Sequence, residues 1–176
     1  MSVAVAFREL ALPGDVELVH EWMQQPHVAP WWELAGPLEL VREYLTSQAA
    51  LEHLDQWIAT DDQREPFAYV ETYRVPDDPL ARLYDAQPGD RGFHLLIGPP
   101  QLLGSGRAQA LVRHLVARLL DQYAITRVVC EPDARNGRML ALCRSLGGEE
   151  LATLELPDRR RVLIGWTRAP RMAAAA

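Results

Sequence analysis

Residues 91–108 read RGFHLLIGPPQLLGSGRA, and the rest of the chain is organised around this stretch. Its first part, Gly92 to Ile97, is a short apolar run typical of a buried strand, interrupted by one ionisable residue, His94. Two prolines end the strand, because each removes a backbone hydrogen-bond donor. A loop with two glycines then leads into a predicted helix, whose apolar residues recur on one face: Ala108, Leu111, Val112, Leu115, Val116 and Leu119.

The loop before this helix favours an anion. The first backbone N–H groups of a helix lack internal partners and lie at the positive end of its dipole. Gly104 and Gly106 let the backbone approach a phosphate without an intervening Cβ atom. The loop is not a Walker A loop, since no Gly-Lys-Ser/Thr follows and the chain contains no lysine.

The residues Gln101 to Gly106 match a Gln/Arg-x-x-Gly-x-Gly/Ala pattern and resemble the GNAT superfamily of N-acetyltransferases, whose loop binds the pyrophosphate of acetyl-coenzyme A. The segment 88–98, PGDRGFHLLIG, resembles one branch more closely. That branch comprises the N6-hydroxylysine acetyltransferases of aerobactin-type pathways and the lysine acyltransferase of mycobactin assembly, which carry Asp-x-Gly-x-His-x-Leu-Ile-Gly before the loop.

The resemblance implies acetyl-CoA or another acyl-CoA as the donor, and no metal. Arg107 is a candidate partner for a coenzyme A phosphate, although a solvated arginine is a comparable interpretation. Carried over to this sequence, the expected coenzyme contacts are Leu96, Ile97, Gln101, Leu102, Leu103, Gly104, Ser105, Gly106, Arg107, Ala108 and Asn136.

Composition bounds the class of protein. With 176 residues the chain is long enough for one domain with a sizeable core. A net charge of -6 disfavours a nucleic-acid partner, which would require a basic face. No apolar run reaches the length of a membrane span, and the N-terminus lacks a signal pattern, so we expect a cytoplasmic protein without a membrane partner. We expect this protein to be a monomer or a homodimer. The two cysteines lie in apolar patterns and are expected to be buried free thiols.

Periodicity predicts one mixed, mostly antiparallel central sheet flanked by helices, and the order of elements is that of the GNAT fold. We expect a single domain over residues 1–168 and a disordered tail at 169–176. The connection at 76–90 is long enough to suggest a functional loop. Strands are predicted at 3–8, 56–60, 66–75, 92–97, 127–131, 150–156 and 161–167, and further helices at 16–24 after an Asp15 cap, at 38–51 and after Asn136. Residues 27–32, with two adjacent tryptophans, are predicted to form a loop.

Acyl transfer from a thioester to an amine needs a held donor, an unprotonated nitrogen and a place for the departing thiolate. An ammonium group must first lose a proton to a base, whereas a hydroxylamine is less basic and arrives neutral. His94 is the first candidate for the base, because its ordinary pKa lies near neutrality. The alternative is a core histidine hydrogen-bonded to a neighbour.

In the resembling branch the catalytic histidine is paired with an aspartate at the end of the next strand, and Asp133 occupies that position here. Its carboxylate would orient the imidazole or bind a cation of the acceptor; otherwise it is an ordinary turn residue. The residues do not decide which of the pair is the working base.

Aromatic residues and one carboxylate suggest an acceptor pocket. The candidates are Trp31, Trp32, Glu71 and Tyr73, with core packing as the alternative for the tryptophans. Many GNAT enzymes also place a tyrosine after the Asn-containing turn to protonate the thiolate. That position is Cys143 here, which leaves either no protein acid or another group such as Tyr123.

Three functions are compatible with these features. The first is an acyl-CoA-dependent N-acyltransferase of siderophore biosynthesis that acts on an amine or N-hydroxylamine of a lysine, ornithine or diamine. The second is an aminoglycoside 6'-N-acetyltransferase, whose family shares the Trp-Trp segment and the donor loop. The third is a non-catalytic protein of this fold that binds coenzyme A.

Overall fold

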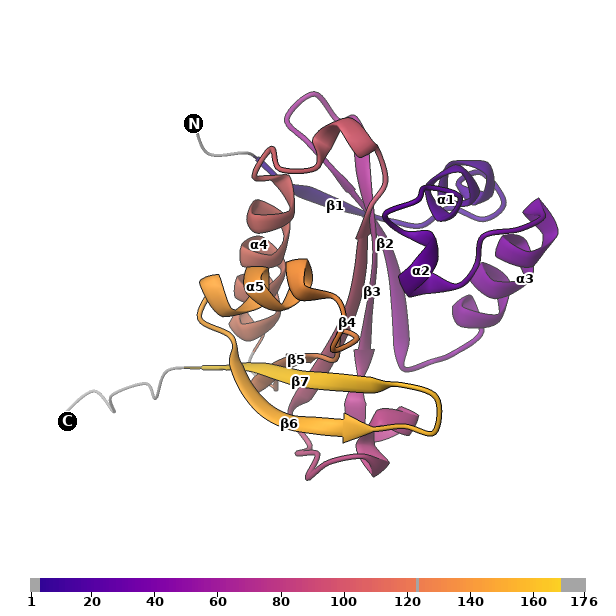
Figure 1. Cartoon of the computed structure of the whole chain (residues 1–176). Coiled ribbons are helices and arrows are strands. Elements are labelled where there is room, and N and C mark those ends of the chain that lie inside the picture. Colours follow the sequence, from indigo (N-terminus) through magenta and orange to yellow (C-terminus); the bar gives the residue numbers. More distant parts are fainter. Residues whose placement is uncertain (1–3, 123, 169–176) are drawn as a thin grey trace.

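A seven-stranded sheet crosses the molecule in the order β1-β2-β3-β4-β5-β7-β6 (Figure 1). Every neighbouring pair is antiparallel except β4 and β5, which confirms the predicted mixed, mostly antiparallel sheet. This computed structural model describes residues 4–122 and 124–168. The predicted tail and Tyr123 lie outside the described residues. The strands are β1 (Ala6–Glu9), β2 (Leu54–Thr60), β3 (Pro66–Arg74), β4 (Asp90–Ile97), β5 (Arg127–Cys130), β6 (Glu149–Glu155) and β7 (Arg160–Thr167).

Helices cover both faces of this sheet (Figure 1). On one face, α4 (Arg107–Asp121) packs its apolar side against the sheet in a core that also takes in α5 (Gly137–Ser145). On the other face, α1 (Val16–Met23), α2 (Ala29–Trp32) and α3 (Leu38–Ala49) pack on β2 to β4. None of the helices in the described residues is long and apolar enough to cross a membrane.

Two local predictions differ from the structure. The segment with Trp31 and Trp32 is a short helix, α2, rather than a loop. Asp15 precedes α1 but does not cap it, because its carboxylate accepts hydrogen bonds from Arg8 at 2.6 and 2.8 Å and from the Ala11 N–H at 2.7 Å. The segment after β3 contains two short 3-10 helices, η1 (Val75–Asp77) and η2 (Pro79–Arg82), and a third, η3 (Pro100–Leu102), precedes α4.

Asp90 fixes the start of β4. Its fully buried carboxylate accepts hydrogen bonds from the Tyr84 hydroxyl at 2.7 Å, the Arg127 Nε at 2.8 Å and the Gln87 N–H at 3.0 Å. Burial alone would raise the pKa of Asp90, but these donors hold it below its ordinary value. The long connection before β4 and the first residue of β5 are thereby joined at one charged group.

The parallel pair of β4 and β5 splits soon after it begins. Only residues 90–92 of β4 pair with residues 127–129 of β5. Beyond Gly92, β4 continues beside β3 as far as Ile97, whereas β5 ends at Cys130. The centre of the sheet therefore opens between two neighbouring strands, and side chains that follow the last pair face one another across the gap.

Candidate active site

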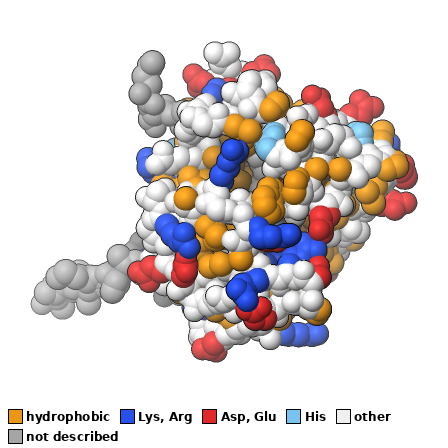
Figure 2. Space-filling view, viewed as in Figure 1, with side chains coloured by type: hydrophobic (Ala, Val, Ile, Leu, Met, Phe, Trp, Pro, Cys, Tyr) orange, Lys and Arg blue, Asp and Glu red, His pale blue; other side chains and the backbone are white. Residues whose placement is uncertain are grey.

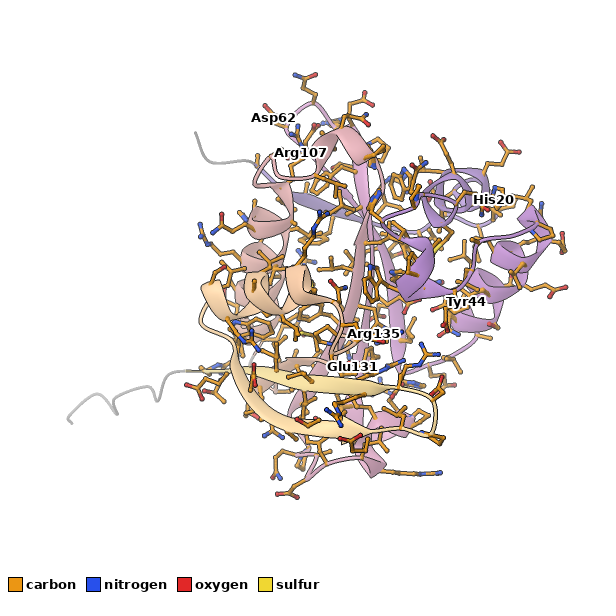
Figure 3. All side chains as sticks on the ribbon, viewed as in Figure 1. His20, Tyr44, Asp62, Arg107, Glu131 and Arg135 are labelled. Atoms are coloured by element: carbon orange, nitrogen blue, oxygen red, sulfur yellow. The ribbon has the colours of Figure 1, made fainter. Side chains whose placement is uncertain are left out.

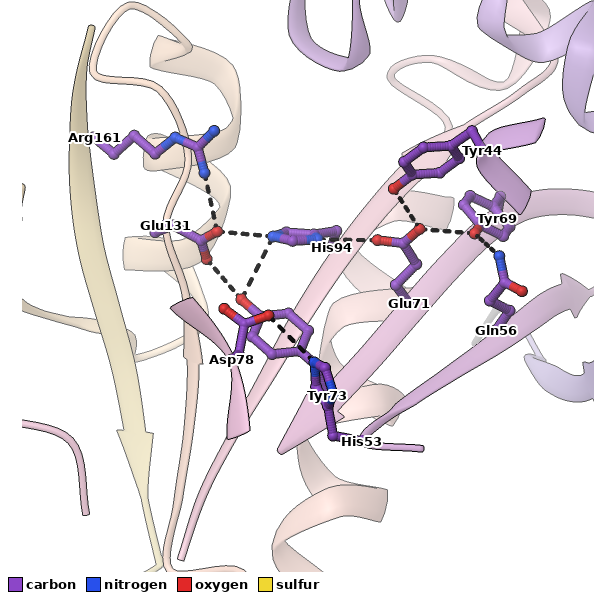
Figure 4. Close-up of polar contacts among 10 residues, drawn as sticks. All are labelled: Tyr44, His53, Gln56, Tyr69, Glu71, Tyr73, Asp78, His94, Glu131 and Arg161. Atoms are coloured by element: carbon purple, nitrogen blue, oxygen red, sulfur yellow. Dashed lines mark hydrogen bonds and ion pairs between the residues drawn. The ribbon is translucent and has the colours of Figure 1, made fainter. Parts of the chain in front are cut away.

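A row of polar side chains crosses the sheet at this gap (Figure 4). Glu71 on β3 lies directly opposite His94 on β4 in the antiparallel register. His94 lies two residues beyond Gly92, and Glu131 lies two residues beyond Val129, where the last parallel pair forms. Since side chains alternate along strands, both residues project from the same face as that last pair. The backbone register thus places one imidazole between two carboxylates.

Both ring nitrogens of His94 are bound. Nδ1 lies 3.0 Å from Oε2 of Glu71, and Nε2 lies 2.7 Å from Oε1 of Glu131. An ionised carboxylate only accepts hydrogen bonds, so each nitrogen must carry a proton, and the ring is an imidazolium. Burial opposes this charge, but Glu131 and then Glu71 outweigh it and raise the pKa of His94 to about 10.

A second set of donors surrounds each carboxylate (Figure 4). The Tyr44 and Tyr69 hydroxyls donate to Oε1 of Glu71 at 2.7 and 2.8 Å. Tyr73 donates to Oε2 of Glu131 at 3.0 Å, and Arg161 to its Oε1 at 3.1 Å.

The pKa values of the three tyrosines and of Glu131 are shifted by this arrangement. Burial and the neighbouring carboxylates raise the pKa of Tyr44, Tyr69 and Tyr73, so the three hydroxyls stay donors. Burial would raise the pKa of Glu131, but His94 and Arg161 hold it below its ordinary value. The result is an alternating series of charges along Glu71, His94, Glu131 and Arg161.

The row opens into a cavity of about 1160 Å³. The His94 side chain is 40% exposed and lines it, whereas the Glu131 side chain is only 4% exposed. The other walls come from the segment 26–32, from β4, from the loop before α4, and from the segment between β5 and α5. Figure 2 shows apolar side chains gathered around a hollow on this face, with arginines along its lower edge. The lining arginines are Arg135, Arg138, Arg159 and Arg161.

The predicted coenzyme residues divide into two groups. Seven of them line the cavity: Leu96, Ile97, Leu103, Gly104, Gly106, Ala108 and Asn136. The other four are not among its lining residues: Gln101, Leu102, Ser105 and Arg107. Arg107 pairs with Asp61 at 3.3 Å, and in Figure 3 it lies beside the β2–β3 turn, well away from Glu131. The expected contact of Arg107 with a coenzyme phosphate therefore competes with an existing partner.

The glycines of the loop have the geometry that an anion cradle requires. Gly104 and Gly106 have φ angles of 75° and 84°, and no atom lies within 4 Å of the position that a Cβ would take. This left-handed backbone strains other residues, and it leaves the loop open in front of the N-terminus of α4. Asn136 caps α5 as predicted, accepting from the Met139 N–H at 3.1 Å.

The predicted acceptor residues lie at two depths. Trp31 and Trp32 line the cavity, and the ring centroid of Trp32 is 6.3 Å from that of His94. Glu71 and Tyr73, by contrast, are each 1% exposed and are not among the lining residues. They belong to the central strand β3, which is covered on both faces, so they contact His94 instead of facing the cavity.

Asp133 lines the cavity without contacting His94. Its carboxylate binds the Arg135 guanidinium at 2.9 and 2.7 Å, and this hydrogen bonding lowers the pKa of Asp133 to about 2. The expected pairing of His94 with this aspartate is absent from the described contacts, and Glu71 and Glu131 orient the imidazole instead. Glu131 was not among the predicted site residues, although strand alternation from Val129 was a usable signal; nothing in the sequence singled out Tyr44.

The residue in the place of the usual tyrosine is a buried thiol. The Cys143 Sγ lies 3.7 Å from the Cys130 Sγ, and both are free, as predicted. The hydrogen bond to Cys143 and burial raise the pKa of Cys130. Because Cys130 lines the cavity and stays protonated, it is a neutral wall rather than a nucleophile.

A split sheet with a glycine loop and a helix N-terminus beside the split defines a class of group-transfer folds that hold an anionic donor. Residues 11–156 match the model of the acetyltransferase (GNAT) domain, and the chain belongs to this family.

Two curated relatives and one solved structure place the chain within the family. It is 31% identical over 161 residues to the N(6)-hydroxylysine O-acetyltransferase of Escherichia coli, covering 91% of this chain and 51% of that protein. It is 29% identical to the N-hydroxyputrescine acetyltransferase of Acinetobacter baumannii, covering 92% of this chain and 77% of that protein. The chain thus spans about half the length of the first relative. The structure of aminoglycoside acetyltransferase AAC(6')-Ib with coenzyme A matches with a TM-score of 0.83 at 28% identity, covering 94% and 95% of the two chains.

Proposed function

We propose that this protein is an acyl-CoA-dependent N-acyltransferase that acylates the nitrogen of an N-hydroxylated amine in siderophore biosynthesis. The observation that carries the proposal is the double hydrogen bonding of His94 to Glu71 and Glu131. Relatives named for N6-hydroxylysine and N-hydroxyputrescine support the same class of acceptor.

Proton counting explains why this site suits a hydroxylamine. The reaction forms a C–N bond, breaks a C–S bond, and transfers one proton from nitrogen to sulfur when the acceptor arrives neutral. No net proton leaves the site, so the reaction needs no residue with a free lone pair to accept one. An ammonium acceptor must lose one more proton, and an imidazolium with both nitrogens donating has no lone pair to take it.

The carboxylates and tryptophans of the site contribute by holding other groups in place and by excluding water. Glu71 and Glu131 occupy both N–H groups of His94, so the ring does not donate to the thioester oxygen; it is held rigidly at the cavity wall, where it positions the acceptor. The tryptophans Trp31 and Trp32 provide an apolar wall that excludes water from the reacting atoms. His94 thus takes the part of a fixed cation, and the general-base role predicted from the sequence stays a prediction.

The donor site follows from the open glycine loop. Gly104 and Gly106 and the N-terminus of α4 would hold the pyrophosphate of an acyl-CoA, and Leu96 and Ile97 would line the path of its pantetheine arm. Bound there, acyl-CoA supplies the activated acyl group. The open loop and the uninterrupted cavity are the observations that this donor fits.

The test is release of free thiol from acetyl-CoA over a panel of acceptors: N6-hydroxylysine, N5-hydroxyornithine, N-hydroxycadaverine, lysine and kanamycin. We expect turnover with at least one hydroxylamine and a rate with lysine lower by at least about a hundredfold, roughly the contribution of a general base. The variant His94→Gln should lose most of the hydroxylamine activity. Equal rates with lysine and N6-hydroxylysine would contradict the proposal.

The likeness to AAC(6')-Ib favours aminoglycoside acetylation as the second candidate. The acidic net charge of -6 would suit a cationic drug, but the cavity itself is lined by four arginines. Turnover of kanamycin at rates above those of every hydroxylamine would establish this candidate instead.

A further inference from the structure

Two arginines of the cavity come from the start of β7 and the turn before it. Arg159 and Arg161 both line the cavity, whereas Arg160 between them pairs with Glu155 at 2.8 Å on the exposed side of the hairpin. This alternation is that of an extended strand, in which every second side chain shares a face. The chain thus directs two guanidinium groups, two residues apart, at one wall of the cavity.

Each of these arginines already binds carboxylates on the protein. Arg159 contacts Glu33 at 3.0 Å and Asp158 at 2.6 Å. Arg161 uses one terminal nitrogen for Glu131 at 3.1 Å, and its side chain is 33% exposed. A guanidinium has five donor hydrogens in a planar fork, so the Glu131 contact leaves the rest of the Arg161 fork for the cavity.

An acidic partner lies directly opposite Arg161. Asp133 and Arg161 form an isolated antiparallel bridge, flanked by backbone hydrogen bonds from Val162 to Pro132 and from Ala134 to Arg160, each at 2.9 Å. Directly opposed residues in an antiparallel pair carry their side chains on the same face, about 5 Å apart at Cβ. Arg135 holds the pKa of Asp133 at about 2, so this carboxylate is ionised at neutral pH.

The location of these charges separates them from the donor loop. The β6–β7 hairpin and the loop before α4 lie at opposite ends of the face seen in Figure 1, and Figure 4 shows Glu131 between Arg161 and His94. An anion held at Gly104 and Gly106 is therefore served by the helix N-terminus. The arginines at the hairpin lie at the other end of the cavity, away from that anion.

We propose that Arg159, Arg161 and Asp133 form a binding site for the zwitterionic α-amino acid head of the acceptor, the two arginines taking the carboxylate and Asp133 the α-ammonium group. This inference rests on the proposed function and names its substrate class: an amino acid with a side-chain hydroxylamine, rather than a diamine. The hydroxylamine end then reaches back toward the exposed imidazole of His94.

The experiment compares two acceptors that differ in one group. N-hydroxycadaverine is N6-hydroxylysine without its carboxylate, and the ratio of their kcat/KM values isolates the recognition of that carboxylate. We expect the intact protein to prefer N6-hydroxylysine by about tenfold to a hundredfold, as for a hydrogen-bonded charge. The analogue 6-(hydroxyamino)hexanoate lacks the α-amine instead, and we expect its kcat/KM to be lower than that of N6-hydroxylysine by a similar factor. In Asp133→Asn this difference between the two acceptors should disappear.

Four arginine variants then show which arginine is responsible for the preference. Arg161→Gln should reduce the ratio to near one; because Arg161 also binds Glu131, the ratio of the two acceptors, and not the absolute rate with either, is the quantity compared. Arg159→Gln should reduce the ratio partly, and the matched control Arg160→Gln should keep it. Arg161→Lys, which retains the charge at this position, should restore part of the ratio.

The outcomes separate this inference from the proposed function. Comparable kcat/KM values for the two acceptors, or a ratio unaffected by both Arg159→Gln and Arg161→Gln, would overturn the amino acid site while the acyltransferase proposal stands. If no hydroxylamine is turned over, the acyltransferase proposal fails. Calorimetry with the coenzyme A-loaded protein then tests the amino acid site independently of turnover. Binding of N6-hydroxylysine at least about tenfold tighter than that of N-hydroxycadaverine would support the site, and equal binding of the two would overturn it.

Discussion

The Nε2 atom of His94 lies 2.7 Å from the Oε1 atom of Glu131, although the strands that lead to these two residues have already stopped pairing. Backbone hydrogen bonds hold β4 and β5 together only as far as Gly92 and Val129. Beyond that point a side-chain contact between an imidazolium and a carboxylate spans the gap. The same contact that assembles the site therefore also limits how far the sheet opens.

The pH dependence of activity tests the charge on His94. Its pKa of about 10 predicts no rise in kcat near pH 6.5 at a saturating concentration of hydroxylamine, where ionisation of the free acceptor does not contribute, and a decline as the pH approaches 10. Because this pKa exceeds the ordinary value of 6.5, the contribution of His94 to stability is complete below pH 6.5 and disappears as the pH rises through 10. Steady-state rates from pH 5.5 to 10 measure the first effect; an increase centred near 6.5 would identify a vacant base.

Replacing Glu131 should change this titration. In Glu131→Gln the imidazolium loses its first carboxylate partner, so we expect the pKa of His94 to fall toward its ordinary value. NMR titration of the imidazole carbon resonances measures the change directly. The matched control is Asp133→Asn, which removes a carboxylate of the same cavity that does not contact His94. An equal shift in the two variants would mean that the cavity's total charge, and not the contact, sets the pKa.

The glycine loop makes a separate prediction about the donor. In Gly104→Ala a Cβ is forced into the left-handed region at φ 75°, at a cost of about 1–2 kcal/mol, and the loop should relax away from its anion-binding form. We expect coenzyme A to bind about tenfold more weakly by calorimetry. Gly147→Ala is the control, since Gly147 has φ 81° but follows α5 outside the cavity. It should lose comparable stability without losing affinity.

The buried pair at the start of β4 should dominate the charge contribution to stability. Arg127→Gln leaves the buried Asp90 carboxylate without its guanidinium, and we expect a loss of about 3 kcal/mol in urea unfolding at pH 7. Since the pKa of Asp90 is lowered in the fold, its contribution is present above the unfolded value of about 4 and disappears as the pH falls further.

An exposed pair gives the comparison. Arg144 and Glu150 are 54% and 47% exposed, so Arg144→Gln should cost at most about 0.5 kcal/mol. A loss of similar size in the two variants would show that the burial of Asp90 does not matter for its pairing.

Local patterns were sufficient for most of the fold. The apolar runs and turn residues predicted every strand, and the Asn136 cap and the helix after Gly106 were found where expected. The errors have a common cause. Asp15 and the Trp31–Trp32 segment look like a cap and a loop in sequence, but an arginine seven residues earlier decides the role of Asp15, and tertiary packing decides the conformation of the tryptophan segment.

The site was less accessible from sequence than the fold. Alternation and family resemblance identified His94, because its position in an apolar strand is unusual. Its partners depend on the register between three strands, which no local pattern encodes. Glu71 was placed among the acceptor contacts and Asp133 was chosen as the partner, whereas the register brings Glu71 and Glu131 to the imidazole.

The contact between Glu33 and Arg159 joins residues that are 126 positions apart in the chain. The cavity therefore draws its walls from segments on both sides of the glycine loop in the sequence, at 26–32 and at 159–161. During synthesis the glycine loop emerges before Arg159 and Arg161. If these arginines form the proposed amino acid site, the growing chain carries the loop for the donor before it carries the residues that select the acceptor.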